Sequence, residues 1–189
     1  MSTDSSIITK QSTPLISKDS KNAEDNGELS LIESISSLLD EIIKKNKNKK
    51  LKSNKTVFYI EDSKVPNISI CSFILYIYSY LNLDFSTILL SLISVQRLLN
   101  LTKDKLSKNN FYKLFITSCL LNSKYNEDYS YSCKFYAIVG KISINELLIL
   151  EKEFCKMIDY KLYVNEEVYH SYYNLIKKRV INSNKKKYN

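Results

Sequence analysis

The residues best suited to acid–base or nucleophilic chemistry are few in this 189-residue chain. The only histidine, His170, falls in a tyrosine-rich C-terminal segment with no serine or cysteine partner at a helpful spacing. A nucleophilic triad therefore lacks its base, and we expect His170 to be structural or exposed. Two glycines cannot build a glycine-rich phosphate loop. We therefore expect that the protein is not an enzyme.

Potential metal ligands do not cluster either. The four cysteines, Cys71, Cys119, Cys133 and Cys155, form no C-x-x-C pair, so a zinc site lacks its ligand spacing. The acidic pair Glu127-Asp128 has no second carboxylate pair at a spacing that would complete a metal site. The cysteines lie in apolar stretches and are typical of reduced core residues. We expect neither a metal nor a cofactor.

One carboxylate interrupts an apolar pattern. In the predicted helix 143–158, Leu147, Phe154 and Ile158 form an apolar stripe, and Glu151 falls within it at helical spacing. A buried carboxylate costs several kcal/mol unless it is paired or hydrogen-bonded. Glu151 is therefore either at the edge of the stripe, where it reaches solvent, or paired with a partner. Periodicity alone favours the solvent-exposed edge.

A lysine offers such a partner. Lys124 falls in the last turn of the predicted helix 108–124, where a positive charge compensates the helix dipole. The alternative is that Lys124 and Glu151 meet between adjacent helices and form a charged pair beside an apolar surface. The spacing of the residues leaves both interpretations open.

The composition and periodicity predict helices as the elements that position these residues. With only two Gly and two Pro, the chain has too few turn residues for a sandwich or barrel. Apolar residues at helical intervals predict helices at 28–45, 69–82, 84–100, 108–124, 130–139 and 143–158, and a last helix from Asn165. Asp84 is a predicted N-cap, Ser143 to Glu146 has the form of a capping box, and Gly140 can end its helix as a C-cap. The short apolar segment 56–60 is expected to be an extended arm against the core.

These patterns predict one folded domain with flanking segments. The expected parts are a disordered leader (1–27), an N-terminal flanking helix with a lysine-rich linker (28–65), a five-helix unit (66–160), a C-terminal helix (161–181) and a basic tail (182–189). No internal repeat is visible, so the length holds a single unit.

The positive net charge lies in two runs. Residues 44–55 carry seven Lys, and residues 177–189 carry five Lys and one Arg, with no acid in either run. Without those thirteen charges, 15 basic and 20 acidic residues remain, a net charge of −5. Such runs are usually solvated, flexible segments or localisation signals, so we do not expect nucleic-acid binding. No signal peptide is visible, and the apolar run Thr87 to Val95 is too short to span a membrane. We expect a cytoplasmic or nuclear protein without a membrane partner.

Several segments together resemble the P-type cyclins, the phosphate-signalling cyclins of yeast that are called U-type in plants. The resemblance covers about residues 28–180. Its motifs are Pro66-Asn-Ile-Ser-Ile70, Phe111-Tyr-Lys-Leu-Phe-Ile-Thr-Ser118, Ser123-Lys-Tyr-Asn-Glu-Asp128, Tyr136-Ala-Ile-Val-Gly-Lys-Ile-Ser143 and Leu150-Glu-Lys-Glu-Phe154.

The resemblance implies an all-α fold with a single five-helix cyclin box and one flanking helix at each end. It also implies a regulatory subunit that binds and activates a cyclin-dependent kinase through the third and fifth box helices. In the family, a lysine and a glutamate at that surface contact the kinase backbone and help to fix its C-helix, and they match Lys124 and Glu151. By their offsets from that pair, the apolar interface positions match Tyr125, Cys155, Tyr160 and Leu162. No obligate homo-oligomer is expected.

Two features depart from the family. Where cyclins commonly hold an Arg in the first box helix against an Asp in the second, this chain has Tyr76 and Gln96, followed by Arg97. The substrate-docking sequence of cell-cycle cyclins is missing from the first box helix. No second box follows, as is usual for P-type members. Two alternatives therefore stay open: a cyclin-fold adaptor that does not activate a kinase, and a cyclin-fold protein that binds nucleic acid.

Overall fold

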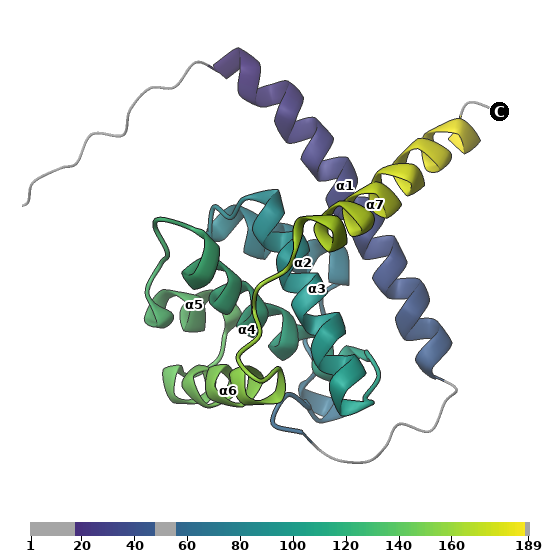
Figure 1. The fold of residues 1–189 in the computed structure, drawn as a ribbon. Helices are drawn as coiled ribbons and strands as arrows, with labels where there is room; N and C mark the ends of the chain where they lie inside the picture. Colours follow the sequence, from purple (N-terminus) through teal and green to yellow (C-terminus); the bar gives the residue numbers. More distant parts are fainter. Residues whose placement is uncertain (1–17, 48–55, 188–189) are drawn as a thin grey trace, which may run out of the picture.

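The structure is a computed structural model that describes residues 18–47 and 56–187, and every regular element in these ranges is helical (Figure 1). This confirms the all-α prediction. The elements are α1 (Lys18–Lys47), the short 3-10 helix η1 (Asp62–Lys64), α2 (Ile70–Tyr80), α3 (Phe85–Thr102), α4 (Lys108–Asn126), α5 (Cys133–Gly140), α6 (Ile144–Met157) and α7 (Glu166–Lys187).

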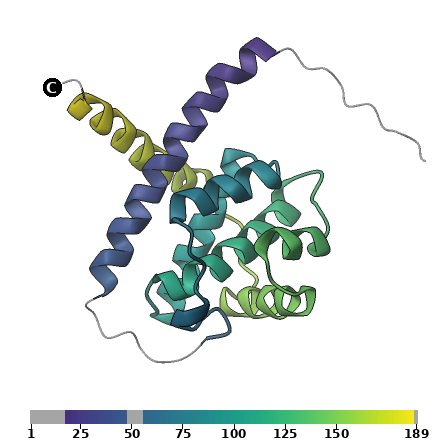
Figure 2. The same ribbon diagram turned by 180° about the vertical axis from the view of Figure 1, so that it is seen from behind.

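Helix α4 forms the centre of the domain. It packs against α3, α5 and α6, and the side chains from Asn110 to Ser123 are buried apart from the half-buried Lys113 (Figure 2). Small polar side chains allow the close approach of α3 and α4, since Ser118 donates a 2.8 Å hydrogen bond to the backbone oxygen of Ser91. The last turn of this central helix is therefore held at a defined place on the surface.

Helix α3 is a long apolar helix. It is long and apolar enough to cross a membrane by length and composition alone, but 56% of it is buried inside the domain. Ten of its side chains, among them Ile88, Leu89 and Leu98, belong to the core. Its composition is explained by packing against α4, α6 and α7.

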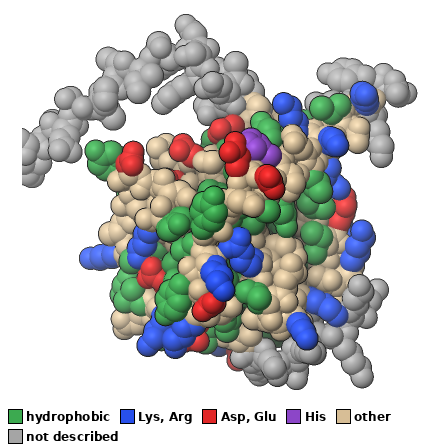
Figure 3. All heavy atoms as spheres, in the orientation of Figure 1, with side chains coloured by type: hydrophobic (Ala, Val, Ile, Leu, Met, Phe, Trp, Pro, Cys, Tyr) green, Lys and Arg blue, Asp and Glu red, His purple; other side chains and the backbone are tan. Residues whose placement is uncertain are grey.

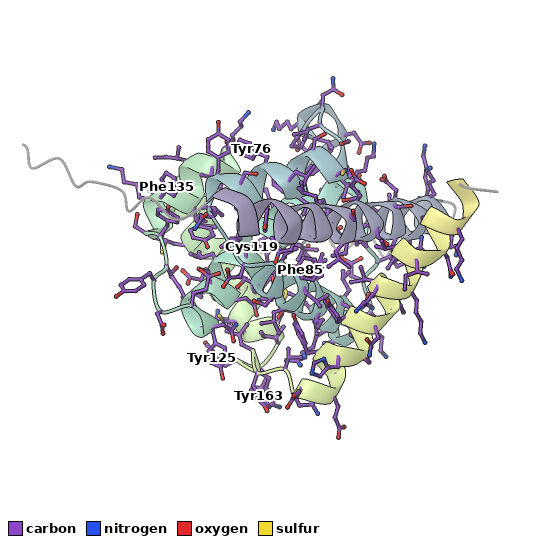
Figure 4. All side chains as sticks on the ribbon, turned by 90° about the horizontal axis from the view of Figure 1, so that it is seen from above. Tyr76, Phe85, Cys119, Tyr125, Phe135 and Tyr163 are labelled. Atoms are coloured by element: carbon purple, nitrogen blue, oxygen red, sulfur yellow. The ribbon has the colours of Figure 1, made fainter. Side chains whose placement is uncertain are left out.

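Helices α1 and α7 cross on the outside of the five central helices (Figures 1 and 4). Helix α1 packs on α2 and α7 and buries Ile32 and Ile35, and α7 buries Ile176. Arg179 forms a 2.7 Å ion pair with Glu41 where the two helices meet. The flanking helices are thus part of the packed structure.

The flanking helices extend further than the sequence pattern predicts. Helix α1 begins at Lys18, inside the segment predicted to be a disordered leader, and it continues through Gly27. A single glycine in a helix costs only about 1 kcal/mol relative to alanine, so it does not have to end the helix. Helix α7 continues past residue 181 to Lys187, so the described part of the predicted basic tail is helical. Residues 1–17 and 48–55 lie outside the described residues.

Two predicted helix-end motifs form differently. Ser143 accepts a hydrogen bond from the backbone N–H of Glu146, but the Glu146 carboxylate forms a 2.8 Å ion pair with Lys113 instead of completing the capping box. Gly140 is the last residue of α5, and Lys141 adopts the left-handed conformation, with φ of 53°, that ends the helix. A Cβ at Gly140 would lie 3.0 Å from Cγ1 of Ile116, so this glycine serves the close contact of α5 with α4.

The predicted arm lies against the core, but it contains a turn. The backbone N–H of Tyr59 bonds to the oxygen of Thr56, and Phe58 is buried with its ring edge-on to Phe154 at 5.9 Å. Ile60 donates a 2.7 Å backbone hydrogen bond to Asn109 at the start of α4. The segment is therefore fixed to the N-terminal end of the central helix.

The sequence pattern predicts four core cysteines, but only Cys119 is buried, and the other three are partly exposed. All four cysteines are free thiols, and burial raises the pKa of Cys119 to about 12, so this thiol stays protonated at neutral pH. His170 is exposed and lies 3.3 Å from Glu166, one turn earlier in α7. Within the described ranges, no three metal-ligating side chains gather into a potential metal site.

Candidate functional site

Lys124 and Glu151 meet across two helices. Nζ of Lys124, in the last turn of α4, lies 2.6 Å from Oε1 of Glu151 in the middle of α6. The Lys124 side chain is 38% exposed and that of Glu151 is 19% exposed. Leu147 and Phe154, on the same helix, are fully buried. Glu151 therefore lies at the edge of the apolar stripe and is paired as well, which combines the two interpretations that its spacing left open.

The surroundings of Lys124 favour its charged form. Burial acts to lower the pKa of Lys124, but hydrogen bonds and charge from Glu151 and Cys133 outweigh it, so the pKa lies above its ordinary value. Burial, reinforced by the Glu151 carboxylate, raises the pKa of the Cys155 thiol. Cys155 is consequently a neutral, partly exposed apolar contact beside an ion pair.

A groove of about 620 Å³ is lined by three of the other predicted site residues. Tyr125 follows Lys124 at the end of α4, and Tyr160 and Leu162 come from the segment between α6 and α7. Tyr125 and Tyr160 are 55% and 69% exposed, so their rings are available to a partner. The structure therefore brings Tyr125, Tyr160 and Leu162 together at one groove.

Two exposed apolar residues that sequence reasoning missed complete this groove. Leu101, at the end of α3, and Tyr163 are 58% and 68% exposed and line the same groove. Tyr125 and Tyr163 lie on the same edge of the molecule in Figure 4. The face crossed by the 158–165 segment carries hydrophobic side chains among charged ones in Figure 3. Leu101 could have been found in the sequence as an apolar residue at the end of a largely buried helix.

Arg97 holds the segment that carries Tyr160 and Leu162. Its guanidinium donates to the backbone oxygen of Lys161 and, at 3.1 Å, to that of Tyr163. A planar guanidinium can reach two carbonyls at once, which fixes this irregular segment to α3. Arg97 is thus a positioning residue, and its role depends on a long-range contact that the sequence does not reveal.

Glu127 fixes the end of α4 that presents Lys124 and Tyr125. One carboxylate oxygen accepts a 2.7 Å hydrogen bond from Thr87 in the first turn of α3, and the other accepts a 2.6 Å bond from Ser123. The carboxylate therefore links two helices near the site.

The two positions that depart from the family pattern interact within their own helices. The Tyr76 ring packs on Tyr80 with centroids 4.4 Å apart, and Gln96 donates a 2.9 Å hydrogen bond to Asn100. Another contact fixes α2, since the Tyr78 hydroxyl donates to the carboxylate of Glu28 on α1.

Comparison with known proteins identifies the family. The family model described as Cyclin matches residues 29–162. The chain is 31% identical over 145 residues to Cyclin-U4-3 of Arabidopsis thaliana, which covers 76% of the chain and 65% of that relative. It is 29% identical over 142 residues to Cyclin-P3-1 of Oryza sativa subsp. japonica, covering 73% of the chain and 59% of that relative.

A yeast relative matches a shorter part. The chain is 38% identical over 73 residues to PHO85 cyclin-7 of Saccharomyces cerevisiae, covering 39% of the chain and 26% of that relative. The chain thus covers at most 65% of the length of any of these three relatives. The matched residues span the five helices α2 to α6, which form the box, together with most of α1. The chain therefore belongs to the cyclin family, and within it to the U/P-type cyclins.

Proposed function

We propose that this protein is the regulatory subunit of a cyclin-dependent kinase, which it binds and activates through α4 and α6. The observation that carries the proposal is the ion pair between Lys124 and Glu151, bordered by Cys155 and close to the groove formed by Tyr125, Tyr160 and Leu162. These six residues are proposed to contact the kinase.

The chemistry of the pair suits contact with the backbone of a partner helix. An ammonium has three N–H groups and a carboxylate has two oxygens, and the Lys124–Glu151 hydrogen bond uses one of each. The pair can therefore also donate to a carbonyl and accept from an amide of a docked chain. The exposed rings of Tyr125 and Tyr160 supply apolar area next to these polar contacts.

Activation would follow from where the cyclin binds. A protein kinase is active when the lysine of its strand β3 pairs with the glutamate of its C-helix. A partner that binds the C-helix only in this arrangement shifts the population of the kinase towards it. The cyclin thus contributes a binding surface, and the kinase carries out phosphoryl transfer.

Capture of a kinase by charge-reversed variants tests the binding surface. The tagged full-length chain is co-expressed with a cyclin-dependent kinase, and the kinase that co-purifies is quantified by mass spectrometry. Glu151→Lys is expected to abolish recovery, because it leaves two positive charges at the contact. Glu153→Lys is the matched control, since Glu153 is on the same helix and pairs only with the nearby Lys156 among the ion pairs of the described residues. Equal recovery with both variants would refute the surface.

A charge swap separates contact with the kinase from stability of the cyclin. The double variant Lys124→Glu/Glu151→Lys restores an ion pair within the cyclin but reverses both charges that face the partner. We expect wild-type thermal stability and no kinase recovery. Wild-type recovery by the swapped variant would mean that the pair serves only the fold.

Kinase activity separates an activator from an adaptor. Phosphorylation of a peptide substrate by the purified kinase is measured with and without the wild-type chain. We expect an increase of at least tenfold on addition of the chain. A stable complex without such an increase would support the adaptor, for which the altered positions Tyr76 and Gln96 leave room.

A further inference from the structure

A basic edge lies where the end of α1 meets the loop between α3 and α4. The amide of Asn46 donates a 2.9 Å hydrogen bond to the backbone oxygen of Leu106, which holds the last turn of α1 on this loop. Residues 44–47 carry three lysines, and residues 103–108 carry three lysines and one acid, Asp104. The two short segments together therefore hold six positive charges and one negative charge, a net charge of +5.

Arg179 of α7 adds a third segment to this edge. Its guanidinium pairs with Glu41 at 2.7 Å, one turn before the lysines of α1. The hydrogen bond and the charge of Arg179, with further contributions from Lys45 and Lys44, hold the pKa of the Glu41 carboxyl below its ordinary value. Figure 3 shows Lys and Arg side chains along the right-hand side of the molecule, where α1 ends in Figure 1. Three segments that are far apart in the sequence thus bring positive charge to one edge.

The six lysines of this edge are available to an external partner. Among the described residues, no carboxylate lies within 4.0 Å of any of their ammonium groups. The single acid, Asp104, accepts a 2.8 Å hydrogen bond from the backbone N–H of Lys105. Lys105 is half-buried, and the other five side chains are exposed: Lys44, Lys45, Lys47, Lys103 and Lys108.

The loop that carries three of these lysines is fixed by hydrogen bonds. The backbone N–H of Asp104 bonds to Leu99 at 3.1 Å, and the amide of Asn110 donates a 2.9 Å bond to the backbone oxygen of Lys105. The sequence pattern predicts flexible runs for the positive charge and, for that reason, no nucleic-acid binding. The charge of this edge is instead held on packed helices and a fixed loop, so that reason does not apply to it.

The composition of the edge favours phosphates over a protein surface or a lipid bilayer. No large apolar side chain is exposed in residues 41–47 or 103–108. The core of a protein interface is apolar and depleted in lysine, and stable attachment to a membrane needs an apolar anchor in addition to a basic patch. The backbone of a nucleic-acid duplex, by contrast, is bound by positive charge alone.

We propose that this edge binds the sugar–phosphate backbone of duplex nucleic acid without regard to sequence. The lysines contact phosphates and release bound counterions, which supplies the binding free energy. None of them lines the groove at Tyr125 and Tyr160. Lys108 is the first residue of α4, whereas Lys124 is in its last turn, so the duplex can bind while the kinase surface is occupied.

Charge reversal tests this proposal. Binding of a fluorescein-labelled DNA duplex of about 20 base pairs to the full-length chain is followed by fluorescence anisotropy at about 50 mM salt. The edge variant Lys45→Glu/Lys103→Glu/Lys108→Glu is expected to bind about thirtyfold more weakly or worse, because three phosphate contacts become repulsive. Since each phosphate contact contributes about 0.9 to the slope of log affinity against log salt, this slope should also flatten by nearly 3.

A matched variant separates this edge from net charge. Lys134→Glu/Lys141→Glu/Lys152→Glu makes the same change of charge at three exposed lysines of α5, its C-cap and α6. Each triple variant contains one lysine with a left-handed backbone, Lys103 or Lys141, so the backbone cost is matched as well. We expect the control to weaken binding less than about threefold. An equal loss in both triple variants overturns the proposal.

Two further outcomes would also overturn it. Residues 48–55 contain four lysines, and replacing all four with glutamine should weaken binding less than the edge variant does. A loss as large as in the edge variant would place the binding in that run. No duplex binding at about 10 µM chain would exclude the nucleic acid, and binding of phosphatidylserine vesicles instead would assign the edge to a membrane. Glu151→Lys should bind the duplex at least as tightly as wild type, so failure of the kinase surface is distinguishable from failure of this edge.

Discussion

An ion pair between two helices depends on tertiary packing, whereas an ion pair within one helix depends only on local spacing. Lys156 and Glu153 are three residues apart on α6, and such exposed pairs contribute at most about 1 kcal/mol. Lys124 and Glu151 come from α4 and α6, so their contact depends on the packing of the two helices. Their significance lies in this placement beside exposed apolar residues, more than in the stability that the pair supplies.

The pH dependence of the pair follows from the direction of the Lys124 pKa. Because this pKa is raised in the folded state, the contribution of the pair is complete below the ordinary lysine value of 10.5 and is lost only as the pH rises through the higher folded value. We therefore expect the difference in melting temperature between wild type and Lys124→Met to be constant from pH 6 to pH 9. A difference that shrinks by pH 9 in parallel thermal melts would contradict this.

At the scale of elements, the two glycines have different roles. Gly27 is in α1 with nothing within 4 Å of an added Cβ, whereas an added Cβ at Gly140 would meet Ile116. We expect Gly27→Ala to raise the free energy of unfolding by up to about 1 kcal/mol through helix propensity. Gly140→Ala should lower it by about 1–2 kcal/mol, because overpacking outweighs the same gain. Urea unfolding of both variants measures this, and stabilisation by Gly140→Ala would disprove the close contact.

The irregular segment after α6 depends on one side chain of α3. We expect Arg97→Met to speed amide hydrogen exchange in residues 158–165 at least fivefold while exchange in α4 stays unchanged, because the guanidinium is lost from two backbone carbonyls. Hydrogen-exchange mass spectrometry on the full chain measures both regions. Unchanged protection in residues 158–165 would mean that Arg97 does not position this segment.

At the scale of the whole molecule, the outer helices join the same core as the box. Ile32, Ile35 and Ile176 are buried, and the Tyr173 ring of α7 lies edge-on to Phe85 of α3 at 6.3 Å. The Arg179 guanidinium at the crossing of the two helices also holds the pKa of the Glu41 carboxyl below its ordinary value. The described domain is therefore expected to unfold as one unit.

Removal of one buried side chain from α7 tests this unity. Ile176 is 3% exposed, so Ile176→Ala should lower the free energy of unfolding by about 2–4 kcal/mol. Leu175→Ala, at a neighbouring position that is 48% exposed, should cost less than about 1 kcal/mol. Far-ultraviolet and near-ultraviolet circular dichroism should follow the same transition. Separate transitions would indicate that α7 unfolds independently.

The sequence alone was sufficient for the class of fold and for the positions of the helices. Turn residues are scarce, and apolar residues repeat at helical intervals, so local periodicity predicts each helix to within a few residues, except at the outer ends of α1 and α7. The family motifs predicted the six proposed contact residues by number. Their roles remain predictions.

Only the tertiary structure decided which of these residues meet. The residue pattern along one helix does not indicate which side chains of a neighbouring helix it will contact. The packing of α3, α4 and α6 therefore decides the Lys124–Glu151 pair, the Arg97 contacts and the Lys113–Glu146 pair. For the same reason, the sequence did not reveal that the Glu146 carboxylate pairs with Lys113 of α4 instead of completing its capping box. It also did not reveal that Gly140 serves the packing of α5 on α4. Local rules determine the helices, and the choice among competing partners is made by contacts between residues far apart in the chain.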